Sequence, residues 1–171
     1  LAVARLEPAE AVWGVGCADV SVDRRERIAD GRTVLGWSPE AMLDQQVSTL
    51  QARRPDGTAI GTFVAFACHP VTTGYDMTIY SSDYVGALRE VVRANGGGEC
   101  VFFQGASGNV LPRVAFTDDE HEAWRVGRRL ALEALRSVAD RTAGTRAYRS
   151  LPEASMVPIV NTKRHRSGCA P

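Results

Sequence analysis

The stretch Phe63-Val64-Ala65-Phe66-Ala67-Cys68-His69-Pro70-Val71-Thr72 decides the fold, because it is an apolar run that stops at a histidine and a proline. Apolar residues at odd and even positions alike are typical of a strand that is buried on both faces of a sheet. A strand over Ile60–Cys68 is therefore predicted to be central and buried. Proline cannot donate to a strand ladder, so the strand ends before Pro70. His69 then lies where a strand gives way to a loop, a common position for a reactive side chain.

A second apolar segment repeats this design. Cys100–Gln104 is predicted to be a buried strand, and it opens into the loop Gly105-Ala106-Ser107-Gly108-Asn109. Two buried strands that each lead into a polar loop indicate one pocket. We therefore expect His69 to face a concave surface that it shares with the loop from Gln104 to Asn109.

Turn signals organise the first half of the chain. Pro55-Asp56-Gly57 predicts an antiparallel hairpin of Gln45–Arg53 with the strand that begins at Ile60. Val12–Val22, rich in valine and small residues, is predicted to be a strand. Asp23–Pro39 is predicted to be a loop, because it contains a run of charges followed by Asp30-Gly31 and Gly36.

Helices are expected in the second half. Ser82 followed by an acidic residue predicts a helix that runs to about Ala94, and Thr117 with Glu120 fits a capping box. Behind Thr117, one helical stripe is formed by Ala123, Gly127, Leu130, Ala131, Ala134, Leu135 and Val138. One or two strands are expected in Thr145–Val160. The fold class predicted is α/β, with a mixed β-sheet and packed helices.

Bulk composition excludes some classes of function. The 20 basic and 20 acidic side chains cancel, so no nucleic-acid partner is expected. No apolar run approaches the ~20 residues that a transmembrane helix needs. The four cysteines are scattered without a CxxC pair, which argues against a zinc knuckle. Because the chain begins at Leu1 without a methionine or a targeting signal, residues 1–171 are interpreted as a single partial domain, and no compartment is assigned.

The residues alone leave two readings of His69 open. A histidine at a strand end can be a zinc ligand or a hydrogen-bonded structural residue, and both are weighed equally. Catalytic zinc usually takes about three protein ligands, and one histidine is not a site. His121 is expected to be a solvated side chain on a helix, and His165 receives no role.

The loop from Gly105 to Asn109 invites comparison with a serine hydrolase. The nucleophile elbow of those enzymes requires G-x-S-x-G, and position 109 is asparagine. Ser107 is therefore a weak nucleophile candidate. The loop is better interpreted as a turn whose backbone N–H groups, Gln104 and Asn109 could orient a substrate.

Several blocks taken in order resemble the neutral/alkaline non-lysosomal ceramidase family, in particular its shorter bacterial members. They cover roughly residues 8–135, and the most specific are the His-Pro block and the Gln-Gly loop. The blocks are Asp23-Arg24-Arg25, the loop Gly31 to Gly36, Ala67-Cys68-His69-Pro70-Val71-Thr72, Ser82-Asp83-Tyr84-Val85-Gly86 and Gln104-Gly105-Ala106-Ser107-Gly108-Asn109-Val110-Leu111-Pro112-Arg113.

The resemblance implies a zinc-dependent amidohydrolase that acts on a lipid or small-molecule amide, with His69 as a ligand of the catalytic Zn²⁺. The family's other ligands come from an earlier histidine and from later acidic and tyrosine residues, and this chain has no histidine before His69. Asn109 matches the family, whereas Leu111 stands where the ceramidases have their catalytic serine. Two alternatives remain: a catalytically inactive or binding-only relative, and a serine hydrolase that uses Ser107.

Overall fold

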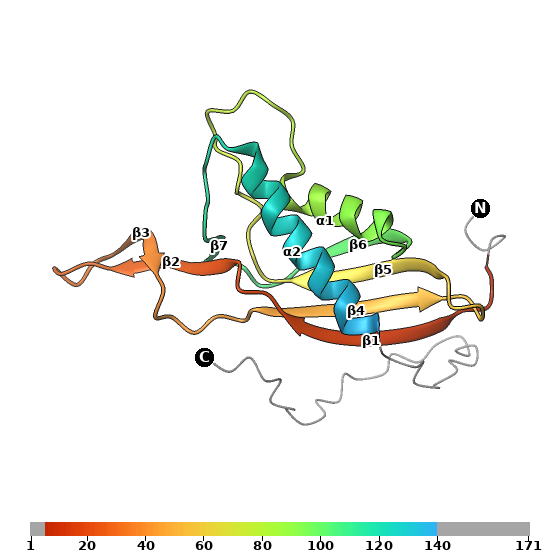
Figure 1. Ribbon diagram of the computed structural model, residues 1–171. Coiled ribbons are helices and arrows are strands. Elements are labelled where there is room, and N and C mark those ends of the chain that lie inside the picture. The colour runs from red at the N-terminus through yellow and green to blue at the C-terminus, as the bar shows by residue number, and fades with distance from the viewer. Residues whose placement is uncertain (1–5, 140–171) are drawn as a thin grey trace, which may run out of the picture.

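The computed structural model describes residues 6–139, and its centre is a four-stranded sheet in the order β1-β4-β5-β6 (Figure 1). These strands are β1 (Glu10–Cys17), β4 (Gln46–Arg53), β5 (Ala59–Phe66) and β6 (Glu99–Gln104). Strands β1, β4 and β5 pair antiparallel, whereas β6 pairs with β5 in parallel. The sheet is therefore mixed, as predicted.

The hairpin of β4 with β5 confirms the turn signal at Pro55-Asp56-Gly57. Gly57 has a φ of 87°, in the left-handed region that glycine tolerates best. The register pairs Ser48 with Ala65, with a bulge between Ala52 and Arg53. Strand β5 ends at Phe66 rather than at the predicted Cys68, so His69 comes three residues after the strand.

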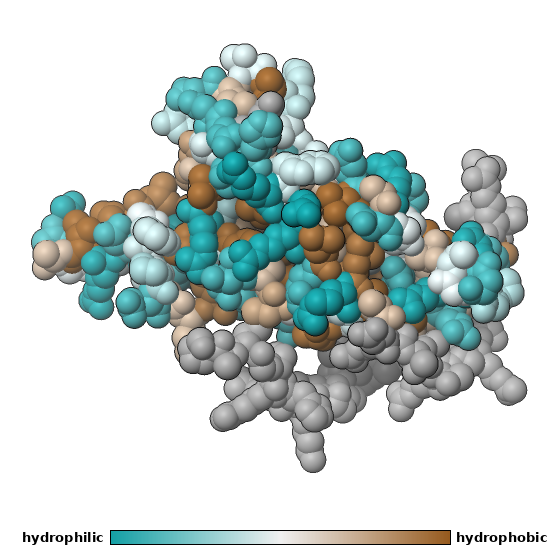
Figure 2. Space-filling view, in the orientation of Figure 1, coloured by the Kyte–Doolittle hydropathy of each residue, from teal (hydrophilic) through white to brown (hydrophobic). Residues whose placement is uncertain are grey.

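Two helices, α1 (Asp83–Ala94) and α2 (Glu120–Ala139), cover one face of the sheet (Figure 1). The predicted stripe of α2 is confirmed, because its members are buried or half-buried while Arg125, Arg128 and Arg129 are exposed. Figure 2 shows hydrophilic side chains along the outer surface of α2. The core between the helices and the sheet includes Val47, Val64, Phe66, Leu88, Val92, Leu130 and Ala134.

Both predicted helix caps need correction. Ser82 is the N-cap residue of α1, as predicted, but it makes no side-chain cap hydrogen bond, and the Ser81 hydroxyl accepts from the Asp83 N–H instead. Helix α2 begins at Glu120, where the Asp119 carboxylate accepts from the His121 N–H. Thr117 accepts from the Asp119 N–H, so it shapes the turn before the helix.

The segment predicted to be a loop after position 22 is a hairpin. Strands β2 (Ser21–Arg27) and β3 (Thr33–Ser38) pair antiparallel, and β2 also pairs with β7 (Val110–Pro112). The single strand predicted over Val12–Val22 is divided, because the chain leaves β1 at Cys17 and enters the second sheet at Ser21. The charged residues of β2 do not show the alternation of a half-buried strand, and the hairpin of β2 with β3 projects from the rest of the molecule (Figure 1).

Strand β5 is central, as predicted, but within the described residues the helices bury only one of its faces. On the other face one apolar row crosses all four strands, because the register aligns Trp13, Leu50, Phe63 and Val101. Phe63 is 37% exposed there. The prediction of burial on both faces is therefore wrong for residues 6–139. The strands predicted over Thr145–Val160 lie outside the described residues.

The contact between the helices gives a test of the fold. A side chain at Gly127 would meet the Tyr84 carbonyl oxygen and the Ala87 Cβ of α1. Gly127→Ala should lower the free energy of unfolding by about 1–3 kcal/mol through overpacking, although alanine favours a helix. Urea unfolding followed by circular dichroism measures this change.

The matched control is Gly86→Ala in α1, where the added methyl meets only the exposed Ser82 side chain, which can rotate away. This variant should be neutral or more stable by up to about 1 kcal/mol. Equal stabilisation by both substitutions would contradict the close packing of α1 on α2.

Candidate functional site

The site is built at one edge of the sheet, where the parallel strands β5 and β6 both end. The Gly105 N–H donates to the Phe66 carbonyl at 2.9 Å, and the His69 N–H donates to the Val110 carbonyl at 3.0 Å. The segment that carries His69 is therefore hydrogen-bonded to the Gln104–Val110 loop at two points, Phe66 and His69. The structure brings these two predicted segments together, as the ends of adjacent parallel strands require.

The Cys68 carbonyl, directly before His69, accepts two side-chain hydrogen bonds. The Tyr84 hydroxyl donates at 2.5 Å from α1, and the Gln104 Nε2 donates at 2.9 Å from β6. Tyr84 is fully buried. Burial raises the pKa of Tyr84, so its hydroxyl keeps its proton and remains a donor. The peptide group between Cys68 and His69 is thus held from two directions.

Gln104 and Ser107 are joined within the loop. The Gln104 Nε2 also donates to the Ser107 hydroxyl oxygen at 2.9 Å, so both of its amide hydrogens have partners. Ser107 is only 8% exposed. A serine nucleophile needs a base that takes its proton, and a donating amide cannot do this. The arrangement suits an anchored loop better than a serine nucleophile.

Asn109 is held by Asp23, which lies in strand β2 and not in the loop that the sequence predicts. Its Nδ2 donates to the Asp23 Oδ2, and the Arg24 N–H donates to the Asn109 carbonyl at 2.8 Å. The other Asp23 oxygen accepts from the Arg25 N–H at 2.7 Å. Asp23 is 8% exposed. Asp23 therefore orients the Asn109 amide and leaves its Oδ1 and one N–H for another partner.

Asp83 fixes the loop that follows His69. The Thr73 N–H and hydroxyl both donate to the Asp83 Oδ2 at 2.8 Å, and the other Asp83 oxygen accepts from the Tyr84 N–H. Asp83 has a φ of 54°, which is uncommon outside glycine and costs backbone energy. Such a backbone conformation persists only where surrounding contacts stabilise it. The hydrogen bonds to Thr73 are among those contacts.

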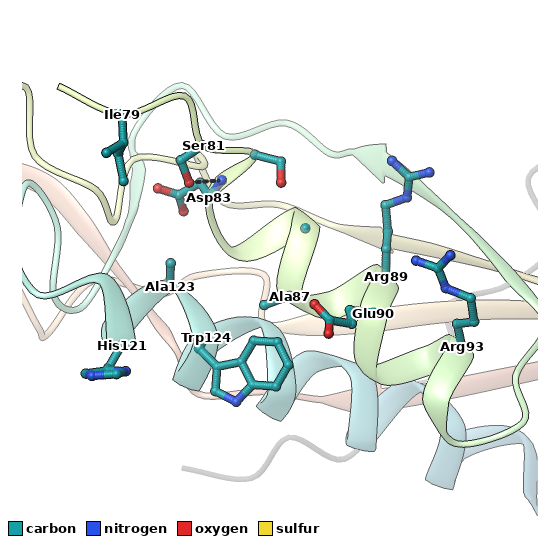
Figure 3. A pocket seen from close by; sticks show the side chains of 12 residues that line it. Ile79, Ser81, Asp83, Ala87, Arg89, Glu90, Arg93, His121, Ala123 and Trp124 are labelled. Carbon is teal, nitrogen blue, oxygen red and sulfur yellow. Dashed lines mark hydrogen bonds between the residues drawn. The ribbon is translucent and has the colours of Figure 1, made fainter. Parts of the chain in front are cut away.

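His69 itself is half-buried, and Leu111 is buried in β7 opposite Val22. A cavity of about 620 Å³ lies between α1 and the start of α2, and Asp83 is part of its lining (Figure 3). Its lining includes Arg89, Arg93 and Trp124 and none of the predicted site residues. The concave surface expected around His69 stays a prediction.

A metal-binding group is absent among residues 6–139: no three His, Cys, Asp or Glu side chains are placed to hold an ion. Cys68, beside His69, is a free and buried thiol. Burial, with a smaller contribution from Asp83, raises the pKa of Cys68 to about 12, so the free thiol keeps its proton at neutral pH. The described residues thus offer His69 as one candidate ligand and do not complete a zinc site.

Among residues 6–139, no helix is both long enough and apolar enough to cross a membrane.

Comparison with known proteins gives a similarity of fold. No family model and no curated protein sequence matches this chain. A solved structure described as a ceramidase complexed with C2 matches with a TM-score of 0.66 and 21% identity, over 81% of this chain and 23% of that one. The neutral ceramidase from Pseudomonas aeruginosa matches with a TM-score of 0.65 and 20% identity, over 81% of this chain and 24% of that one. The chain spans about a quarter of these ceramidases, and it has the fold of that part of them.

Proposed function

We propose that the chain forms part of the active site of a ceramidase-like hydrolase that cleaves an amide bond in a lipid or a small molecule. The observation that carries the proposal is the junction of the His69 segment with the Gln104–Val110 loop, on a fold shared with two solved ceramidases. These are the two segments in which the sequence most resembles the ceramidase family. Hydrolysis of N-acylsphingosine is the first activity to test.

In this proposal His69 is one ligand of a catalytic zinc ion. Such an ion lowers the pKa of a bound water to about 7 and polarises a carbonyl group. Since residues 6–139 offer one candidate ligand where catalytic zinc takes about three, the others would come from outside the described residues. His69 is half-buried in the loop after β5, an environment that suits a ligand as well as a structural histidine.

Asn109 orients the substrate in this proposal. Its remaining N–H can donate to a substrate carbonyl oxygen, and its Oδ1 can accept from a substrate N–H. The hydrogen bond to Asp23 holds the amide plane before the substrate binds, which lowers the entropic cost of alignment. Gln104 acts on the protein itself, because both of its amide hydrogens are used on Cys68 and Ser107.

A second candidate function is binding without catalysis. Leu111 favours it, because this side chain is apolar and buried where the ceramidases have a catalytic serine. Ceramide bound by the natural protein without hydrolysis, together with tolerance of His69→Ala, would support this alternative.

The activity proposal predicts a graded response to substitution in the natural protein. His69→Ala should abolish amide hydrolysis. Asn109→Ala should lower the rate by about 10²–10³, the usual cost of losing one orienting donor. Ser107→Ala should retain most activity, because the nucleophile is expected to be a water molecule. Turnover of a fluorescent N-acylsphingosine measures the rates.

His121→Ala is the matched control, because this histidine is exposed at the start of α2. The activity of this variant should equal that of the unsubstituted protein. A covalent fluorophosphonate adduct on Ser107 with complete inactivation would contradict a water nucleophile and would support the serine hydrolase.

Metal binding gives a second test. The 171-residue chain alone should bind zinc weakly and be inactive, because residues 6–139 offer His69 as one candidate ligand. Isothermal titration with zinc at neutral pH measures the affinity. Tight stoichiometric binding that survives His69→Ala would show that the metal site lies elsewhere.

The cysteines give a third test. Burial raises the pKa of Cys68 to about 12 and that of Cys100 to about 11, so both remain protonated at pH 8. Neither should react with a maleimide in the folded protein, and both should react in 6 M guanidinium, where the pKa returns to its usual ~8.5. Mass spectrometry of the labelled peptides measures this. Rapid labelling of folded Cys68 with loss of activity would contradict the burial described for this thiol.

A further inference from the structure

The turn that carries His69 is pinned on both sides by neighbouring residues of one helix. Tyr84 donates to the Cys68 carbonyl, one residue before His69. Asp83 accepts two hydrogen bonds from Thr73, four residues after it. Asp83 and Tyr84 are the first two residues of α1.

The contact of Tyr84 is specific to its hydroxyl group. The phenol ring is fully buried and packs edge-on against Phe102, with ring centroids 6.0 Å apart. A phenylalanine could keep this packing, so apolar burial alone does not explain the hydroxyl. The hydroxyl lies 2.5 Å from the Cys68 oxygen, which fixes the plane of the peptide that leads into His69.

The contact of Asp83 is specific to its carboxylate group. The Oδ2 accepts from both the N–H and the hydroxyl of Thr73, so this single oxygen sets the position and the side-chain rotamer of Thr73. Asp83 holds a left-handed φ of 54° while making these bonds. An aspartate retained in this conformation indicates that its contacts outweigh the backbone cost.

Helix α1 is a rigid support for both contacts. Tyr84 and Leu88 are fully buried in the core, and α1 packs closely on α2 at Gly127. A turn tied to the first residues of such a helix cannot move without either breaking these hydrogen bonds or shifting the core.

We propose that Asp83 and Tyr84 are positioning residues that set the orientation of the His69 imidazole by holding the backbone on either side of it. The inference rests on the proposed function only in taking His69 as the group that acts. Gln104 is the second support of the Cys68 carbonyl, and it holds that oxygen from the β6 side.

The test compares Tyr84→Phe and Asp83→Asn with the exposed controls Tyr80→Phe and Asp76→Asn. Asparagine tolerates a left-handed φ as aspartate does, so Asp83→Asn changes the hydrogen bonds and not the backbone preference. Native-state hydrogen exchange and the ring resonances of His69 are measured by NMR at one pH. The ring resonances of His121, at the start of α2, are the internal reference.

The His69 amide should exchange roughly tenfold faster in Tyr84→Phe, since one buried hydrogen bond is lost. Core amides such as that of Val64 should change much less. The His69 ring resonances should move in Tyr84→Phe and in Asp83→Asn, while those of His121 stay in place. Both controls should leave His69 unchanged. In an active protein, Tyr84→Phe should lower kcat with little change in KM.

An equal loss of protection at His69 and at Val64, with unmoved His69 ring resonances, would overturn the proposal and leave Tyr84 with a role in stability alone. If Tyr84→Phe fails to fold, Gln104→Met removes the other donor to Cys68 and gives the same comparison. The proposed function can fail independently of this inference. In that case His69→Ala would leave hydrolysis intact, while Tyr84→Phe and Asp83→Asn would still move the His69 ring resonances.

Discussion

The parallel pairing of β5 with β6 is the constraint on which the rest of the structure depends. Parallel neighbours cannot be joined by a tight turn, so the chain must leave the sheet after Phe66 and return through a crossover, which here contains α1. The return passes Gly98, whose φ is 71° and where a Cβ would lie 2.5 Å from the Ile60 carbonyl oxygen. The same pairing brings the carboxyl ends of both strands to one edge of the sheet. The site and its supporting helix are both consequences of this one register.

The parts of the fold that depend on local signals could be predicted from the sequence. The turn at Pro55-Asp56-Gly57 places β4 beside β5, and the apolar stripe of α2 identifies its buried side. The neighbourhood of His69 and the loop after Gln104 could also be predicted, because two apolar strands end at these points. The catalytic and metal-binding roles of these residues stay predictions.

The parts that depend on contacts between distant residues could not be predicted. Asp23 lies in a charged segment without an apolar pattern. It contacts Asn109, which is 86 positions later in the chain, only because β2 pairs with β7. Tyr84 lies in a segment that resembles the ceramidase family, yet no spacing rule shows that its hydroxyl reaches the Cys68 carbonyl. The sequence also does not reveal how much of β5 is buried, since an apolar strand has the same sequence whether or not its second face is covered.

The apolar row lies on the face of the sheet that points away from α1 and α2, and this affects which positions of β5 tolerate substitution. Along β5, Thr62, Val64 and Phe66 face the helices and are buried, whereas Phe63 and Ala65 face the other way. Burial of apolar area stabilises only the side chains that lose contact with water. A saturation scan of this strand for retained folding would therefore alternate with a period of two residues. The intolerant positions would trace the helix-covered face, and the tolerant ones would mark side chains whose apolar character serves something other than the folding of residues 6–139.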